Sequence, residues 1–340
     1  KQIEAFDAIF GVGLLAASRG DLAMHNNTWK MEQNLNVTAS DIVQLLIQHG
    51  ANPFERTIQG GVSLLHWACG TGNVDVVKVL LPYFARHRNN DNNDDDDDNN
   101  NNPLLIRTDR DGATLLHWAA AGATAREFGT GGYAHVCEYL LTECERRRQP
   151  LLSSLSSSSS PQRPISSRDL VNQRTVDGNT PLMWAAWSGS IDTVKLLVRH
   201  RADTTVANRN GCTVAHWAAS GGSLEVCQYL GEVVDNVDFF QPNHGGNTPL
   251  THAVAFGRLD VVEWIRKRQD SLGRHNSGDQ EDEDDIIAIQ LAADFVGWNS
   301  DKDVSVMKKR RKIMQLFENQ HHVNDDDVDD DDDDDPFGIG

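Results

Sequence analysis

The stretch GNTPLMWAAWSGSIDTVKLLVRH, residues 178–200, decides how this chain folds. It opens on Gly178, which suits a tight turn, and places Thr180 before Pro181, where a threonine caps a helix and a proline begins it. Small residues follow, and then apolar residues at helical spacing, which indicates a second helix. The stretch therefore predicts a turn followed by two short helices.

The same pattern occurs in four further places. They are GVSLLHWACGTGNVDVVKVLL at 61–81, GATLLHWAA at 112–120, GCTVAHWAASGGSLEVCQYL at 211–230 and GNTPLTHAVAFGRLDVVEWI at 246–265. Gly178, Gly211 and Gly246 are separated by 33 and 35 residues, whereas Gly61, Gly112 and Gly178 are separated by 51 and 66. Low-complexity insertions account for the longer spacings, so the chain is a tandem repeat.

The repeat resembles the ankyrin repeat, because residues 178–203 follow that family's G-x-T-P-L-x-x-A-A-x-x-G, V-x-L-L and A-D motifs. The resemblance implies an all-α solenoid of helical hairpins with short β-turn fingers. It also implies about six repeats and a degenerate C-terminal helix pair. Gly50 has the place of the left-handed residue that ends the second helix of a repeat, and Arg201 stands where the family usually has this glycine.

The insertions divide the array into segments. We expect two N-terminal repeats at 1–88, the first divergent with helices at 13–22 and 41–53 around an insertion at 23–40, then an Asn/Asp-rich disordered loop at 89–103. One repeat follows at 104–149 with an internal loop at 123–131, then a Ser-rich disordered loop at 150–168 and three repeats at 169–270. An acidic linker at 271–285, capping helices at 286–319 and an acidic disordered tail at 320–340 complete the chain.

The negative charge is confined to a few tracts. The chain has 50 acidic and 31 basic residues, but the tracts at 89–102, 279–285 and 325–335 hold 22 of the acids and none of the bases. The rest of the chain is close to neutral and has no broad basic face, so we expect no binding of nucleic acid.

Cysteine usage and hydropathy indicate the compartment. The five cysteines form no CxxC pair, which favours buried thiols in a reducing environment. The longest apolar run, at 8–17, is too short to span a bilayer, and acidic residues precede it. We expect a soluble protein of the cytoplasm or nucleus that contacts no membrane and is monomeric on its own.

Residues with catalytic or metal-binding chemistry are scattered. His66, His117 and His216 recur at matching places, but each lies on a different repeat, about 10 Å from the next, whereas zinc ligands lie about 2 Å from one point. The resemblance implies that each bonds to backbone in the neighbouring turn. No phosphate loop, nucleophile elbow or HExxH motif is present. We therefore expect no metal, no cofactor and no enzymatic activity.

A stack of hairpins with turns on one side suits the recognition of another protein, so the sequence favours a scaffold or adaptor that binds a partner on a concave surface. The alternative is a regulatory subunit or substrate receptor of an enzyme complex. The resemblance places partner contacts on the turns and on the exposed ends of the first helices. The corresponding residues are Asp177, Asn179, Trp187, Ser188, Arg209, Ser220, His244, Asn247 and Phe256.

The two tryptophans of the opening stretch have different roles in this prediction. Trp184 shares its column with Trp67, Trp118 and Trp217 and is expected to belong to the scaffold. Trp187 has no counterpart in the other repeats and is expected to contact the partner. The alternative for Trp187 is that it packs under the loop at 150–168.

A basic cluster precedes the acidic tail. Lys308, Lys309, Arg310, Arg311 and Lys312 have the composition of a nuclear localisation signal. Alternatively, they are the solvated face of a last helix whose buried side includes Ile313.

Overall fold

The computed structural model describes residues 38–58, 60–87, 102–122, 132–154, 164–272 and 312–313. Compact packing divides the chain into a first unit, residues 1–249, and a second, residues 250–340. The described α-helices are α2 (Ala39–Gln48), α3 (Leu64–Gly70), α4 (Val74–His87), α5 (Leu115–Ala121), α7 (Ala134–Ser154), α8 (Ser167–Val171), α9 (Pro181–Ser188), α10 (Ile191–Arg199), α11 (Val214–Gly221), α12 (Leu224–Gln228), α13 (Pro249–Ala255) and α14 (Leu259–Ser271). A 3₁₀ turn, η1, spans Pro103–Leu105, and a π-helical turn, η2, spans Tyr229–Val233.

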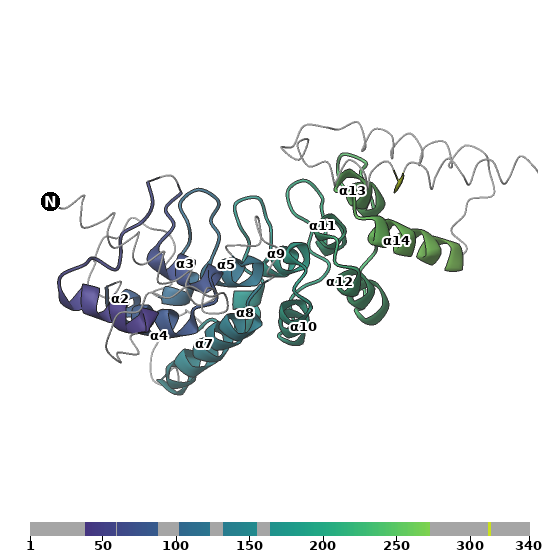
Figure 1. The fold of residues 1–340 in the computed structure, drawn as a ribbon. Coiled ribbons are helices and arrows are strands. Elements are labelled where there is room, and N and C mark those ends of the chain that lie inside the picture. The colour runs from purple at the N-terminus through teal and green to yellow at the C-terminus, as the bar shows by residue number, and fades with distance from the viewer. Residues whose placement is uncertain are drawn as a thin grey trace, which may run out of the picture. The chain divides into compact units, whose positions relative to one another are not determined.

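The helices of the first unit form hairpins that stack in sequence order. Helix α3 packs on α4, α5 on α7, α9 on α10 and α11 on α12, while α3, α5, α9 and α11 also pack on one another in a row (Figure 1). The second unit contains the helices α13 and α14. The described residues contain no strand, only isolated bridges in two turns, so the predicted all-α repeat fold is confirmed.

The first helices begin where the sequence predicts. The Thr180 side chain accepts a hydrogen bond from the N–H of Met183, and Pro181 occupies the first helical position. In α3, α5 and α11 the cap is Ser63, Thr114 or Thr213, and a histidine three residues later bonds back to the cap residue. This reciprocal arrangement satisfies backbone donors that the first turn of a helix leaves open.

The second helices end as the repeat pattern predicts. Gly50 has φ 90° after α2, and Arg201 has φ 64° at the equivalent place after α10. A side chain in this left-handed region is strained by about 1 to 2 kcal/mol, whereas glycine is not. The repeat geometry therefore imposes the conformation even where the residue opposes it.

The core consists of small residues on the first helices and branched apolar residues on the second. Ala68, Ala119, Ala185 and Ala218 are completely buried, which lets neighbouring first helices approach closely. Their partners on the second helices, such as Val77 and Val194, are also completely buried. Each hairpin thus covers the next.

Three arginines link successive turns, a feature that the repeat motif does not predict. The guanidinium of Arg56 donates to the carbonyl oxygen of Arg107 at 3.0 Å, and that of Arg107 donates to the carbonyl oxygen of Arg174 at 2.8 Å. Arg174 donates to the carbonyl oxygen of Ala207. Each arginine also donates to its own turn, at Gly61, Gly112 or Gly178. We call this set the arginine ladder.

Several predicted boundaries differ from the structure. Helix α7 continues to Ser154 and α8 begins at Ser167, so both ends of the Ser-rich segment at 150–168 are helical rather than loop. Thr38 caps α2, which places Ala39 and Ser40 in the helix and not in the insertion at 23–40. Pro103, assigned to the loop at 89–103, is buried in η1.

Other predicted segments lie outside the described residues. These are the first helix at 13–22, the internal loop at 123–131, the centres of the loops at 89–103 and 150–168, and, except for Lys312 and Ile313, everything from 273 onwards.

Candidate functional site

Four tryptophans follow the row of first helices. Trp67, Trp118, Trp184 and Trp217 occupy one column and are all half-buried. The rings of Trp67 and Trp118 lie 5.5 Å apart, and the ring of Trp184 stands edge-on to that of His117 at 5.3 Å. The column links adjacent repeats, as predicted for a scaffold. The column is not wholly interior, however, because each of the four tryptophan side chains, Trp184 included, keeps part of its surface exposed.

The recurring histidines belong to the same stack. The backbone N–H of Thr114 donates to Nδ1 of His117, whose Nε2 lies 3.1 Å from the carbonyl oxygen of Asn179 in the next turn. His216 repeats both contacts, with Nε2 3.0 Å from the carbonyl oxygen of Asn247. The imidazoles of His117 and His216 thus join a helix start to the following repeat, as the resemblance implies, whereas Nε2 of the buried His66 makes no hydrogen bond within the described residues.

Burial keeps these imidazoles neutral. Loss of solvent lowers the pKa of His66 and of His117 to about 4, and it also lowers the pKa of His216. No group of three or more potential metal ligands occurs within the described residues. His117 and His216 are structural links, because each contacts a carbonyl oxygen of the next turn.

Trp187 lies one helical turn after Trp184 on α9 and is half-buried. At the same position Gly70, Ala121 and Ser220 are small and buried, so a large side chain occurs there in α9 and not in α3, α5 or α11. The neighbouring helix α11 approaches through Gly221, where an added Cβ would lie 2.5 Å from the carbonyl oxygen of Trp187. The backbone of α9 at Trp187 therefore packs directly against the backbone of α11.

Ser188, predicted as a partner contact, bonds within the array instead. Its hydroxyl donates to the carbonyl oxygen of Ala185 at 2.9 Å and lies 3.2 Å from that of Ala120 on α5. It also accepts from the N–H of Gly132, where the chain re-enters the described structure after the internal loop. Ser188 thus links α9 to α5 and to Gly132.

Three of the predicted contacts are exposed on the turns. Asp177, Arg209 and His244 lie at the tips of successive turns before α9, α11 and α13. The N–H of Arg209 donates to the carbonyl oxygen of Asp177 at 2.9 Å, and Nδ1 of His244 lies 3.1 Å from the carbonyl oxygen of Arg209. These bonds hold the tips in line and leave the carboxylate of Asp177 and the guanidinium of Arg209 exposed.

The remaining predicted contacts differ in their accessibility. Asn179 is half-buried, and its side-chain oxygen accepts from the amide of Asn208 at 2.8 Å, whereas Asn247 is exposed. Ser220 is only 7% exposed, and its hydroxyl donates to the carbonyl oxygen of His216, so the prediction that it contacts a partner conflicts with its burial.

Phe256 is half-buried in the second unit. Four residues of the basic cluster lie outside the described residues, namely Lys308, Lys309, Arg310 and Arg311. The fifth, Lys312, is exposed, and its neighbour Ile313 is buried.

The described chain offers little reactive chemistry. All five cysteines are buried, and burial raises the pKa of Cys144 and of Cys227 to about 12, which holds them as thiols. Within the described residues no helix has the length and apolar character that a membrane span requires.

Most of the chain is similar to known proteins. A family model for ankyrin repeats matches residues 33–149, 107–232 and 200–275. The palmitoyltransferase AKR1 of Lachancea kluyveri is 25% identical over 265 residues, which are 72% of this chain and 29% of that protein. The Notch-regulated ankyrin repeat-containing protein B of Danio rerio is 42% identical over 60 residues, 18% of this chain and 54% of the relative.

A third relative is the mitochondrial liver isoform of glutaminase from Mus musculus, 32% identical over 90 residues, 26% of this chain and 15% of that protein. The chain thus spans only a minor part of the two enzymes that it resembles.

Proposed function

The chain belongs to the ankyrin-repeat family, and we propose that it is a non-catalytic module that binds another protein on the face formed by its turns and first helices. Ankyrin repeats generally serve protein recognition, because each repeat adds side chains to one extended surface. The observation that carries the proposal is Trp187, a large aromatic side chain at a position that is small in the preceding repeats and in the following one.

Trp187 has the properties of an interface anchor. Tryptophan is among the residues that contribute most to binding energy, and a half-buried indole loses little conformational entropy when a partner covers it. Helix α11 approaches the backbone of Trp187 closely through Gly221. A partner that covers the indole would bury apolar surface at a rigid site.

Charged turn tips supply the rim of the proposed surface. Asp177 and Arg209 are exposed on adjacent turns, and His244 is exposed on the next. Opposite charges at a rim steer and orient a partner more than they strengthen binding. We therefore assign affinity to Trp187 and orientation to the tips, and we omit Ser188 and Ser220, whose hydroxyl groups bond within the array.

The test is a comparison of two variants in affinity purification from the source cell. Trp187→Ala should lose the partner while its melting temperature stays unchanged. Trp184→Ala should lower the melting temperature, because it removes the edge contact with His117. Full recovery of the same proteins by Trp187→Ala would contradict the proposal.

A second candidate function is the recruiting region of a larger enzyme system, as a regulatory subunit or a substrate receptor. The similarity to a palmitoyltransferase over 72% of this chain favours it. An enzyme that co-purifies in stoichiometric amount, or an enzymatic domain in the same polypeptide, would support this function over that of a free-standing adaptor.

We further infer a monomer in the cytoplasm or nucleus. Five buried cysteine thiols suit a reducing compartment. Light scattering of the purified chain and microscopy of a tagged chain test these two points, and the basic cluster is tested by neutralising Lys308 to Lys312.

A further inference from the structure

Three half-buried tryptophans lie on the adjacent helices α9 and α11. Trp184 and Trp187 belong to α9 and Trp217 belongs to α11, and the two helices pack directly on each other. Their backbones come close together, because an added Cβ at Gly221 would lie 2.5 Å from the carbonyl oxygen of Trp187. We call the three indoles of these two helices the indole junction.

The indole nitrogens of this junction differ from those earlier in the array. The rings of Trp67 and Trp118 lie 5.5 Å apart, and both of their N–H groups are buried without a hydrogen-bond partner. Within the described residues no ring contact joins Trp184 to Trp217, and no hydrogen bond engages the N–H groups of the indole junction, which are not buried. The junction thus keeps three donors for a partner.

The acceptor groups beside these indoles are already in use. The hydroxyl of Ser188 donates to the carbonyl oxygen of Ala185 and accepts from the N–H of Gly132. The hydroxyl of Ser220 donates to the carbonyl oxygen of His216. Because the backbone carbonyls within α9 and α11 accept helical hydrogen bonds, we expect the partner to bring acceptors for the indole donors.

Polyproline II is the backbone conformation that meets this requirement. Its carbonyl oxygens make no internal hydrogen bonds, whereas a helix engages its own carbonyls and an added β-strand needs a free sheet edge. The described residues contain no strand and so offer no such edge. Proline also lacks an N–H group, so a proline-rich segment carries acceptors without donors that binding would leave unpaired.

The spacing of the repeats matches this conformation. Trp184 and Trp217 occupy the same place on packed helices, so their Cα atoms are separated by about one interhelical distance, about 8 to 10 Å. Polyproline II has three residues per turn and rises about 3.1 Å per residue, so residues i and i+3 lie on one face about 9 Å apart. Two prolines at this separation can pack on Trp184 and Trp217 while the segment passes Trp187.

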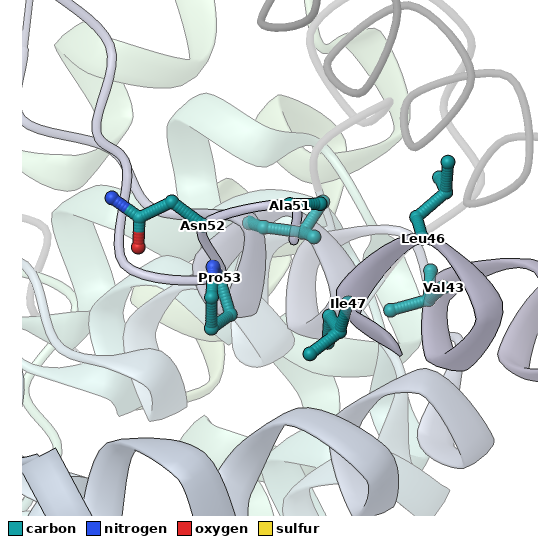
Figure 2. Close-up of a pocket in the computed structure, with 7 residues that line it drawn as sticks. Val43, Leu46, Ile47, Ala51, Asn52 and Pro53 are labelled. Atoms are coloured by element: carbon teal, nitrogen blue, oxygen red, sulfur yellow. The ribbon is translucent and has the colours of Figure 1, made fainter. Parts of the chain in front are cut away.

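The apolar pocket beside α2 lacks this chemistry. Apolar side chains, among them Val43 and Leu46, line most of it (Figure 2). None of its lining residues is aromatic, and the side chain of its one amide residue, Asn52, already accepts from the N–H of Phe54. We therefore expect no proline-rich segment in this pocket, and Leu46 provides a control position.

We propose that the partner presents a proline-rich segment in the polyproline II conformation, which packs on Trp184 and Trp217 and accepts hydrogen bonds from the indole junction. The proposal rests on the proposed protein-binding function and specifies its ligand. Such a segment is ordered before it binds, which lowers the entropy cost of docking on isolated aromatic side chains.

Calorimetric titration of the purified full chain with a blocked peptide of nine prolines tests the proposal. We expect saturable binding that is at least about tenfold weaker in Trp187→Ala. Trp217→Phe keeps an aromatic ring but loses the N–H donor, and it should weaken binding about fivefold. Trp118→Phe, whose native N–H is buried, and Leu46→Ala should leave the affinity unchanged. No saturable binding, or equal weakening by Trp217→Phe and Trp118→Phe, would overturn the proposal.

A competition experiment separates this proposal from the proposed function. Proteins that the intact chain recovers and Trp187→Ala loses should also be displaced by the nine-proline peptide at about 1 mM, and not by a glycine–serine peptide of equal length. If those proteins stay bound, the proline inference is wrong although the protein-binding function stands, and displacement by an amphipathic leucine–lysine helix would identify a helical partner instead. If Trp187→Ala loses no protein, the proposed function fails and the assignment of its ligand fails with it.

Discussion

The guanidinium of Arg107 donates a hydrogen bond to the backbone carbonyl of Arg174, 2.8 Å away in the next turn, although 67 residues separate them in sequence. The same guanidinium donates to the carbonyl oxygen of Gly112 in its own turn and to the side chain of Gln173. One side chain thus ties together two repeats that the Ser-rich insertion separates.

Replacing Arg107 should weaken this junction. We expect Arg107→Met to lower the free energy of unfolding, measured in urea, by about 1 to 3 kcal/mol. The substitution removes a charged donor and leaves the carbonyl oxygens of Gly112 and Arg174 without this hydrogen bond. The matched control is Arg110→Met on the same turn, where the native side chain is exposed and the change should stay within about 0.5 kcal/mol. Equal effects from the two variants would show that the arginine ladder contributes nothing.

Arg201 offers a substitution that should stabilise the array. Since its φ of 64° suits glycine, Arg201→Gly should raise the free energy of unfolding by about 0.5 to 1 kcal/mol after allowance for the more flexible unfolded chain. Arg199→Gly, within α10, should lower it by about 1 kcal/mol. Urea denaturation of the two variants checks the conformational explanation. The explanation requires changes of opposite sign in the free energy of unfolding, although both variants replace arginine by glycine.

Stability should fall as the pH drops from about 6.5 towards 4. The native state keeps His66, His117 and His216 neutral because burial lowers each pKa, whereas the same side chains in the unfolded chain take up protons below pH 6.5. Protons therefore favour unfolding, by about 1.4 kcal/mol per pH unit for each of His66 and His117, and the full stability is present above pH 6.5.

Urea denaturation between pH 7 and 5, above the range in which carboxylates titrate, measures this slope. His117→Gln should lower the free energy of unfolding at pH 7. It should also reduce the dependence of that free energy on pH by the contribution of one histidine. A slope that is unchanged in this variant would contradict the assignment of His117 as a buried neutral link.

Local signals in the sequence predicted the scaffold well. The cap at Thr180, the left-handed residue at Gly50 and the histidine bonds to the next turn depend on residues within one or two repeats, so the motif contains them. The arginine ladder was missed because Arg107 and Arg174 stand at different distances from their turn glycines, Gly112 and Gly178, and become equivalent only when the turns fold.

The candidate site was less predictable. Ser188 and Ser220 look like surface residues in sequence, but their hydroxyl groups bond to backbone carbonyls, which a one-dimensional pattern does not reveal. The half-burial of Trp184 was missed for a related reason, since a repeated column need not be an interior one.

The most direct test of the central proposal is quantitative affinity purification with the intact chain and with Trp187→Ala, at matched expression and melting temperature. The proposed function predicts that at least one protein recovered in near-stoichiometric amount falls about tenfold or more with Trp187→Ala and is retained by Arg199→Ala on the opposite helix of the hairpin. Equal recovery of every such protein by Trp187→Ala and the intact chain would contradict it.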